Sequence, residues 1–222
     1  YNPIALNNSG AGATTYSIGG ILVTSAHNAN SDLFLIGTGT IQGPNGGTGD
    51  LVIHNWATDY NNAAGAVVND DAYIRIDNVI GGTGGVTYAG TPTSLSYPHV
   101  NNTYTGVTTI NGSQVLVEAS VAPSTAGRLG NASADPANLV INGGALINTT
   151  STAVTVSRLF SIGLNGATLT SSSTSTGAFV FNGTFNGSNA IGMVGYGART
   201  LTLRGLGTAA NTLAVSLGDG GG

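Results

Sequence analysis

Residues 108–117 read Thr-Thr-Ile-Asn-Gly-Ser-Gln-Val-Leu-Val, so an Asn-Gly pair stands between two short runs of β-branched and apolar side chains. The same arrangement returns further along the chain, at Asn142-Gly143, Asn165-Gly166, Asn182-Gly183 and, more loosely, around Gly205. The glycines are 31, 23, 17 and 22 residues apart, an imperfect period of roughly twenty. A period of that length is typical of a solenoid, whose repeats bury their apolar faces only by stacking.

The Asn-Gly pairs are predicted to turn the chain between short strands, because both residue types tolerate a positive φ. Stacked repeats bring equivalent positions together, and stacked asparagines satisfy one another's amides. We therefore predict structural corner turns at Asn111, Gly112, Asn142, Gly143, Asn165, Gly166, Asn182 and Gly183.

The rest of the chain also favours strands. No segment keeps a period of 3.6, and Gly or Pro interrupts nearly every window of about twelve residues. Residues 70–78 alternate most clearly, with Ile74 and Ile76 on one face and Arg75 and Asp77 in a charge ladder on the other. We predict an all-β fold without substantial helix, in which about ten short coils pair in parallel.

The predicted organisation is one domain. Residues 36–222 form the solenoid, and the repeats are clearest over 102–217. Residues 1–35 are the least repetitive, so we expect them to be an N-terminal cap or a segment that pairs with a neighbouring molecule. The chain starts at Tyr1 without a Met, as a processed form or a fragment of a longer protein does.

The composition excludes several chemistries. Only 6% of residues are charged, there is no Cys, and all five basic residues are Arg. Disulfides, thiol chemistry and Lys-based catalysis are therefore excluded. A net charge of −4 argues against nucleic acid, and no apolar run has the length of a membrane span, so we expect no membrane insertion by this segment.

Charge is distributed unevenly. Residues 1–111 hold six Asp and one Arg, a net charge of −5, and residues 112–222 hold two Asp, one Glu and four Arg, a net charge of +1. One interpretation is scatter among few charges. The other is a rod whose two ends attract each other.

Catalysis or metal binding would need clustered carboxylates. Asp70 and Asp71 are the candidates for an acid/base pair or for Ca²⁺ ligands, beside Asp59 and Asp77. Adjacent strand residues point to opposite faces, so Asp70 and Asp71 converge only in a turn. A solvated turn is the more common role, and we expect no catalytic site, no cofactor other than Ca²⁺, and no metal site elsewhere.

The remaining candidate side chains are aromatic rings and imidazoles. Trp56 and the tyrosines of the first half favour a sugar-contacting surface there, although burial in a core is more common. These tyrosines are Tyr60, Tyr73, Tyr88, Tyr97 and Tyr104. His27, His54 and His99 lack metal-ligand spacing, and each is expected to be a lone polar residue.

Residues 102–112, Asn-Thr-Tyr-Thr-Gly-Val-Thr-Thr-Ile-Asn-Gly, resemble the autotransporter-associated β-strand repeat, usually close to NTYTGGTTINGGTL. Val107 and Ser113 stand where that family commonly has Gly. The resemblance covers about 100–222 well and 33–56 loosely. It includes the stretches at 127–130, 139–146, 158–163 and 201–220.

The resemblance implies a right-handed parallel β-helix, as in passenger domains of large bacterial surface proteins. Such domains are exported and displayed outside the cell, often as stalks of adhesins. The family has no shared catalytic residues to carry over to this sequence.

Two functional hypotheses follow. The first is an extracellular bacterial structural protein, not an enzyme: a rod that builds a surface fibre, filament or adhesin stalk by head-to-tail self-association. Its contacts would be further copies of itself and surface glycans or neighbouring cells. The alternative is a carbohydrate-binding or polysaccharide-degrading β-helix protein.

Overall fold

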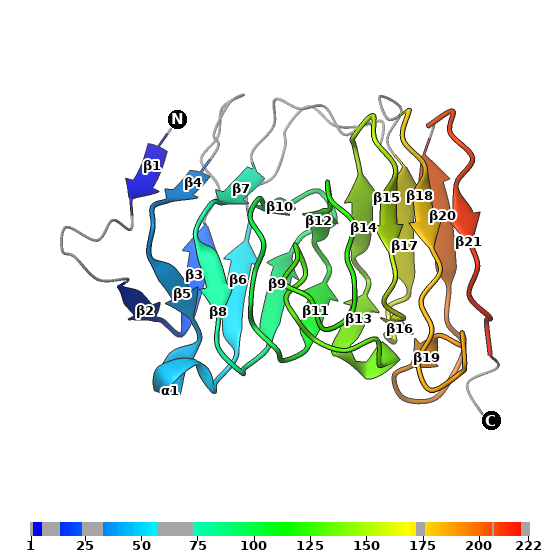
Figure 1. Cartoon of the computed structure of the whole chain (residues 1–222), viewed down its shortest axis with the longest axis horizontal. Helices are drawn as coiled ribbons and strands as arrows, with labels where there is room; N and C mark the ends of the chain where they lie inside the picture. The colour runs from blue at the N-terminus through cyan, green and yellow to red at the C-terminus, as the bar shows by residue number, and fades with distance from the viewer. Residues whose placement is uncertain are drawn as a thin grey trace.

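The computed structural model describes residues 2–5, 14–23, 33–56, 73–171, 176–205 and 207–218, and these are almost entirely β-structure (Figure 1). The largest sheet has eight strands in the order β1 (Asn2–Ala5), β4 (Leu33–Ile36), β7 (Tyr73–Ile76), β10 (Leu95–Pro98), β12 (Gln114–Leu116), β14 (Ala145–Asn148), β17 (Ala167–Ser171) and β20 (Leu201–Gly205). A second sheet has seven strands in the order β19 (Gly192–Met193), β16 (Ser161–Ile162), β13 (Leu139–Asn142), β11 (Thr108–Asn111), β9 (Val86–Gly90), β6 (Leu51–Asn55) and β3 (Gly20–Val23).

Two three-stranded sheets complete the β-structure. One consists of β2 (Thr15–Ser17), β5 (Thr40–Gln42) and β8 (Val79–Gly81), and the other of β15 (Val154–Val156), β18 (Phe179–Phe181) and β21 (Thr212–Leu213). Helical structure in the described residues is limited to the turn α1 (Pro44–Gly47) and the 3₁₀ turn η1 (Pro136–Asn138). In α1, Asn45 and Gly46 have left-handed dihedral angles. The prediction of an all-β fold is confirmed, and no described helix is long and apolar enough to cross a membrane.

Every strand pair in these sheets is parallel. Parallel neighbours need a long connection, and here the chain passes through the other sheets before it returns. In the eight-stranded sheet, Val115 pairs with Leu146, Leu146 with Leu169, and Leu169 with Leu203. One row of equivalent positions therefore runs across the sheet.

The sheets enclose one continuous apolar core that extends from Leu35 to Ile191. Alternate strand residues point inward, which explains why Ile74 and Ile76 are fully buried while Arg75 between them is half-buried. Each buried Val, Leu or Ile side chain contributes about 1.5–3 kcal/mol. The alternation predicted for residues 73–77 is confirmed, including an Arg75–Asp77 ion pair on the outward face.

The described parts of residues 1–35 belong to the sheets. β1, β2 and β3 are the first strands of three different sheets, and they pair in parallel with β4, β5 and β6. The half-buried side chains of Ile18, Ile21 and Val23 pack against the core. This segment therefore continues the architecture of the strands that follow it.

Candidate functional site

A short ladder of asparagines lies at one corner of the molecule. The Asn142 side chain donates from Nδ2 to Oδ1 of Asn111 over 2.9 Å, and its own Oδ1 accepts from the backbone N–H of Asn165 over 3.0 Å. Each bond joins one turn of the chain to the next. Asn111 and Asn142 thus bond as stacked side-chain amides do, and Asn165 joins them through its backbone.

Three glycines of the predicted corner turns have positive φ angles: 75° at Gly112, 71° at Gly143 and 82° at Gly166. Gly183 does not, and its role is a close approach. A Cβ there would lie 2.6 Å from the carbonyl carbon of Arg158, so only Gly fits. Asn182 accepts a hydrogen bond from the Ser157 hydroxyl over 3.0 Å instead of extending the ladder.

The acidic candidates Asp59, Asp70 and Asp71 lie outside the described residues, as does His27. Within the described ranges, no group of three or more His, Asp or Glu side chains is placed to hold a metal ion. Asp77 is described, and it belongs to a cluster of a different kind.

The Arg75 cluster, which we define as Arg75, Asp77, Tyr97, His99 and Glu118, is a dense polar group on the outward side of the eight-stranded sheet. Parallel pairing of β7 with β10 sets Arg75 directly opposite Tyr97. Arg75 Nε donates to Asp77 Oδ1 over 2.9 Å, and its guanidinium lies 5.8 Å from the centre of the Tyr97 ring. The Tyr97 hydroxyl donates to Glu118 Oε2.

His99 lies between the two charges of this cluster. Its Nδ1 is 2.6 Å from Asp77 Oδ1 and 2.7 Å from Arg75 Nη2. A ring nitrogen either donates or accepts. Nδ1 therefore donates to Asp77 when it carries a proton and accepts from Arg75 when it does not. The expectation that His99 is a lone polar residue is wrong, because strand pairing brings it to charges 22 and 24 residues away.

The pKa values in the cluster follow from these contacts. Burial tends to lower the pKa of Arg75, but the hydrogen bond and charge of Asp77 outweigh it, so the pKa is raised. Burial, followed by the bond to Glu118, raises the pKa of Tyr97. Arg75 stays charged and Tyr97 stays neutral at physiological pH.

Both carboxylates of the cluster are already bound by groups of this chain. Asp77 faces Arg75 and His99, and Glu118 accepts from Tyr97 and, over 3.2 Å, from the Thr149 hydroxyl. A substrate would have to displace these donors to use either carboxylate as an acid or base. The arrangement therefore suits cross-linking of neighbouring strands.

A second polar group, which no sequence pattern predicted, lies inside the core. Arg158 is fully buried. Its Nη1 donates to the carbonyl of Leu129 over 2.6 Å and its Nη2 to that of Asn138 over 2.8 Å. Burial lowers its pKa, and no described acidic side chain forms an ion pair with it. It holds the long connection between β12 and β13 against the core.

Two core tyrosines accompany Arg158. Tyr104 exchanges a 2.8 Å hydrogen bond with Thr108, whose hydroxyl also reaches the carbonyl of Leu129. Burial raises the pKa of Tyr104 to about 12 and that of Tyr88 well above its ordinary value. Both rings are fully buried, so they belong to the core and not to a sugar-contacting surface.

Trp56 is the exposed member of the aromatic candidates. Its indole is 47% exposed and stacks on His54, with ring centroids 5.2 Å apart and planes inclined by 27°. A flat, accessible indole is a surface on which a sugar ring can stack.

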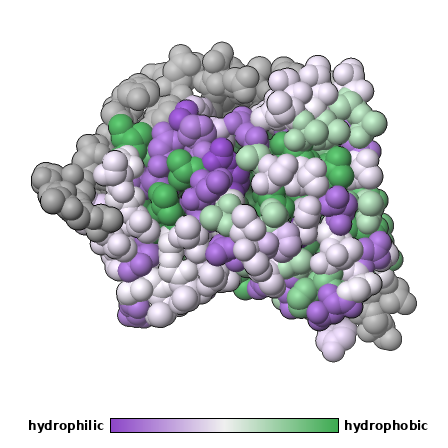
Figure 2. Space-filling view, in the orientation of Figure 1, coloured by the Kyte–Doolittle hydropathy of each residue, from purple (hydrophilic) through white to green (hydrophobic). Residues whose placement is uncertain are grey.

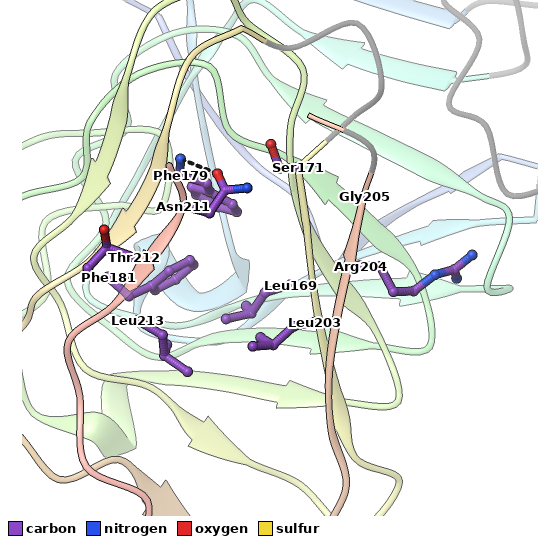
Figure 3. Close-up of a pocket in the computed structure, with 10 residues that line it drawn as sticks. All are labelled: Leu169, Ser171, Phe179, Phe181, Leu203, Arg204, Gly205, Asn211, Thr212 and Leu213. Carbon is purple, nitrogen blue, oxygen red and sulfur yellow. Dashed lines mark hydrogen bonds between the residues drawn. The ribbon is translucent and has the colours of Figure 1, made fainter. Parts of the chain in front are cut away.

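A pocket lies where β17 and β20 of the large sheet meet β18 and β21 (Figure 3). Its volume is about 240 Å³, and its apolar wall consists of Leu169, Phe179, Phe181, Leu203 and Leu213. Asn211 at its rim accepts from the backbone N–H of Phe179 over 2.8 Å. Arg204 lines the outside and extends away from the other side chains (Figure 3).

One polar atom in this pocket has no partner among the described residues. Ser171 is 3% exposed, and its hydroxyl makes no hydrogen bond to any of them. A buried hydroxyl without a partner costs about 1–3 kcal/mol. The pocket therefore offers apolar surface together with a buried hydroxyl that has no partner among the described residues.

In comparisons with known proteins, no family model, curated protein or solved structure matches the chain.

Proposed function

We propose that this chain is a right-handed parallel β-helix that acts as a structural rod on the outside of a bacterial cell, in a fibre, filament or adhesin stalk. The proposal combines the resemblance of residues 102–112 with the strand pairing. It assigns the chain no catalytic activity. In this proposal residues 1–35 are an N-terminal cap or pair with a neighbouring copy, and residues 36–222 form the body.

The observation that carries the proposal is the unbroken row of equivalent positions across the large sheet. Residues at one position in successive turns pair in parallel from Asn2 through Ile74 and Val115 to Leu203. Rows of this kind, around one continuous core, are what a solenoid produces. A solenoid is an extended, nearly one-dimensional object, which suits a spacer or a fibre.

The rod is proposed to assemble head to tail. The negative first half and the slightly positive second half favour contact between unlike ends. A heterologous contact that does not close generates an open filament.

Electron microscopy of the purified chain, paired with sedimentation velocity over a range of concentrations, tests this proposal. We expect fibres whose axial repeat equals one rod length, roughly 38 Å for the eight strands of the large sheet at a spacing of about 4.8 Å. Isolated rods at every concentration would contradict the filament and leave the stalk. A compact particle without parallel β-strands stacked along one axis would contradict the rod itself.

A second candidate function, carbohydrate binding, is favoured by the exposed Trp56–His54 stack. Trp56 is the one tryptophan in the chain, so fluorescence during glycan titration reports on it directly. The variants are compared by titration calorimetry, because Trp56→Ala removes the only indole of the chain. Binding heat that is lost in Trp56→Ala, and retained when Asp70 and Asp71 are both changed to Ala, would place binding at the stack. The inverse result would favour the acidic pair, and calcium titration of the same variants tests it as a Ca²⁺ site.

Release of reducing ends from a polysaccharide panel would contradict the assignment as a non-enzyme. No change in fluorescence and no release across the panel would remove the carbohydrate hypothesis altogether.

A further inference from the structure

We infer that the pocket beside β20 and β21 receives the N-terminal edge of a second copy, whose β1 pairs in parallel with β20 so that Leu203 lies opposite Asn2. This inference rests on the proposed head-to-tail assembly and specifies its contact surface and register.

The receiving end is incompletely covered. Among the described residues, β20 and β21 each have a parallel partner on one side only, β17 and β18 respectively. Leu203 occupies the same row as Val115 and Leu146, which are fully buried, yet it is 61% exposed. Leu203 and Leu213 belong to the apolar wall of the pocket. In earlier turns, inward side chains such as Leu146 are covered by the turn that follows.

Hydrophobic side chains also gather on the surface near this end. Those with large exposed fractions in this part of the chain are Leu164, Val194, Tyr196, Leu203 and Leu217. Figure 2 shows hydrophobic patches among weakly polar residues toward the C-terminal end of the visible face. Such surface, next to unpaired strand edges, favours association with another sheet.

The N-terminal edge provides a matching surface. β1, β2 and β3 are each first in their sheets, so their outer edges have no strand partner among the described residues. Ile18, Ile21 and Val23 pack against the core from this end and stay only half-buried. The N-terminal and C-terminal ends are both cross-sections of the same core, so the two ends complement each other in shape. A second copy of this chain is therefore the partner that fits.

The register follows from the rows. Within the chain, Leu203 is in the row of Leu169, Leu146, Val115, Ser96 and Ile74. The same row continues through Leu33 to Asn2. A second copy that continues the lattice sets its Asn2 beside Leu203 and its Ile4, which pairs with buried Leu35, beside Gly205. Charge supports this polarity, since the acidic half of one copy meets the basic half of the next.

Disulfide trapping tests the register, because the chain has no cysteine of its own. Adjacent parallel strands are about 4.8 Å apart, within the Cα–Cα range of a disulfide. The double variant Asn2→Cys with Leu203→Cys should give a ladder of covalent oligomers after mild oxidation. The matched control is Asn2→Cys with Leu164→Cys, because Leu164 is exposed to nearly the same degree, 63%, but belongs to no edge strand.

Covalent oligomers that form only with Asn2→Cys and Leu203→Cys together support the inference. Equal ladders from both pairs, or dimers of Leu203→Cys alone as abundant as the mixed product, overturn it. Fibres in the microscope without a ladder overturn this register and leave the filament intact. Monomers with neither fibres nor ladder overturn both proposals.

A charge in the pocket tests the surface independently of cysteines. Leu213→Glu should abolish association at concentrations where the unaltered chain assembles, since Leu213 lines the pocket. Val107→Glu, at an apolar residue that is 37% exposed and lies outside the pocket, is the control and should still assemble. Circular dichroism of both variants shows whether the fold is retained. If folded Leu213→Glu assembles as well as the control, the pocket is not the contact.

Discussion

The middle of the molecule and its C-terminal end carry the same pattern and differ in burial. Leu146 and Leu203 occupy one row of the same sheet, two strands apart, but Leu146 is fully buried and Leu203 is 61% exposed. Nothing in the local sequence distinguishes an inward Leu of β14 from one of β20. The difference arises because each turn is covered by the next, so stability here is a property of neighbours.

The largest expected effect tests this contrast directly. Leu146→Ala should destabilise the chain by about 2–5 kcal/mol, because it leaves a cavity in a closed part of the core. Leu203→Ala should cost less than about 0.5 kcal/mol in the monomer, as exposed substitutions do. Urea unfolding followed by circular dichroism measures both, and equal losses would contradict the comparison.

The same difference between the middle of the molecule and its C-terminal end is expected for polar side chains, as Arg158 and Arg204 show. Arg158→Met should destabilise by about 2–4 kcal/mol, because two hydrogen bonds from a charged donor are lost and the Leu129 carbonyl keeps only the Thr108 hydroxyl. Arg204→Met, at the exposed end, is the control and should change stability by less than about 0.5 kcal/mol. A neutral Arg158→Met would mean that water replaces both bonds.

Alkaline pH should weaken the middle of the molecule through its buried tyrosines. The pKa of Tyr104 is about 12 in the folded chain, against about 10 when unfolded, so its contribution is complete below pH ~10. Above that pH the unfolded state ionises first, and about 3 kcal/mol is lost by pH ~12. Urea unfolding at several pH values measures the slope, and Tyr104→Phe should flatten it. An unchanged slope would assign the loss to other groups.

The smallest effect is expected at the corner. Asn142→Ala removes two hydrogen bonds of the asparagine ladder and should cost about 1 kcal/mol, because the site is half-buried. Asn165→Ala keeps the backbone N–H that the ladder uses, so it should cost only a few tenths of a kcal/mol. The order of the two unfolding midpoints is the readout. A larger loss in Asn165→Ala would show that the ladder is not the source of stability.

The alternation of apolar residues and the Asn-Gly spacing were enough to predict the all-β fold. Val115 and Leu146, for example, are inward because every second strand residue faces the core. The parallel direction of pairing followed from the need of each repeat to stack on the next. These are local or periodic properties, and a single sequence contains them.

The sites were harder to predict, because their members are distant in sequence. His99 meets Asp77 only after β10 has paired with β7, and a histidine without metal-ligand spacing gave no sign of it. Arg158 resembles any surface arginine until the connection from Leu129 to Asn138 closes over it. Close approach is also invisible in a sequence, which is why Gly183 was assigned to a corner turn although backbone contact is what requires Gly there.

The asparagine ladder has a consequence for the chemical lifetime of the protein. An Asn-Gly pair ages when the glycine nitrogen attacks the asparagine side-chain carbonyl and expels ammonia, which gives a cyclic imide that water then opens to isoaspartate or aspartate. In this chain the amide N–H of Gly112 donates to the Asn142 carbonyl over 3.0 Å, and that of Gly143 donates to the Gly166 carbonyl over 2.7 Å. Both nitrogens are held away from the reaction, so we expect mass spectrometry to find isoaspartate at residues 111 and 142 only after unfolding. The hydrogen bonds that form this corner would then also slow deamidation of the two Asn-Gly pairs in it.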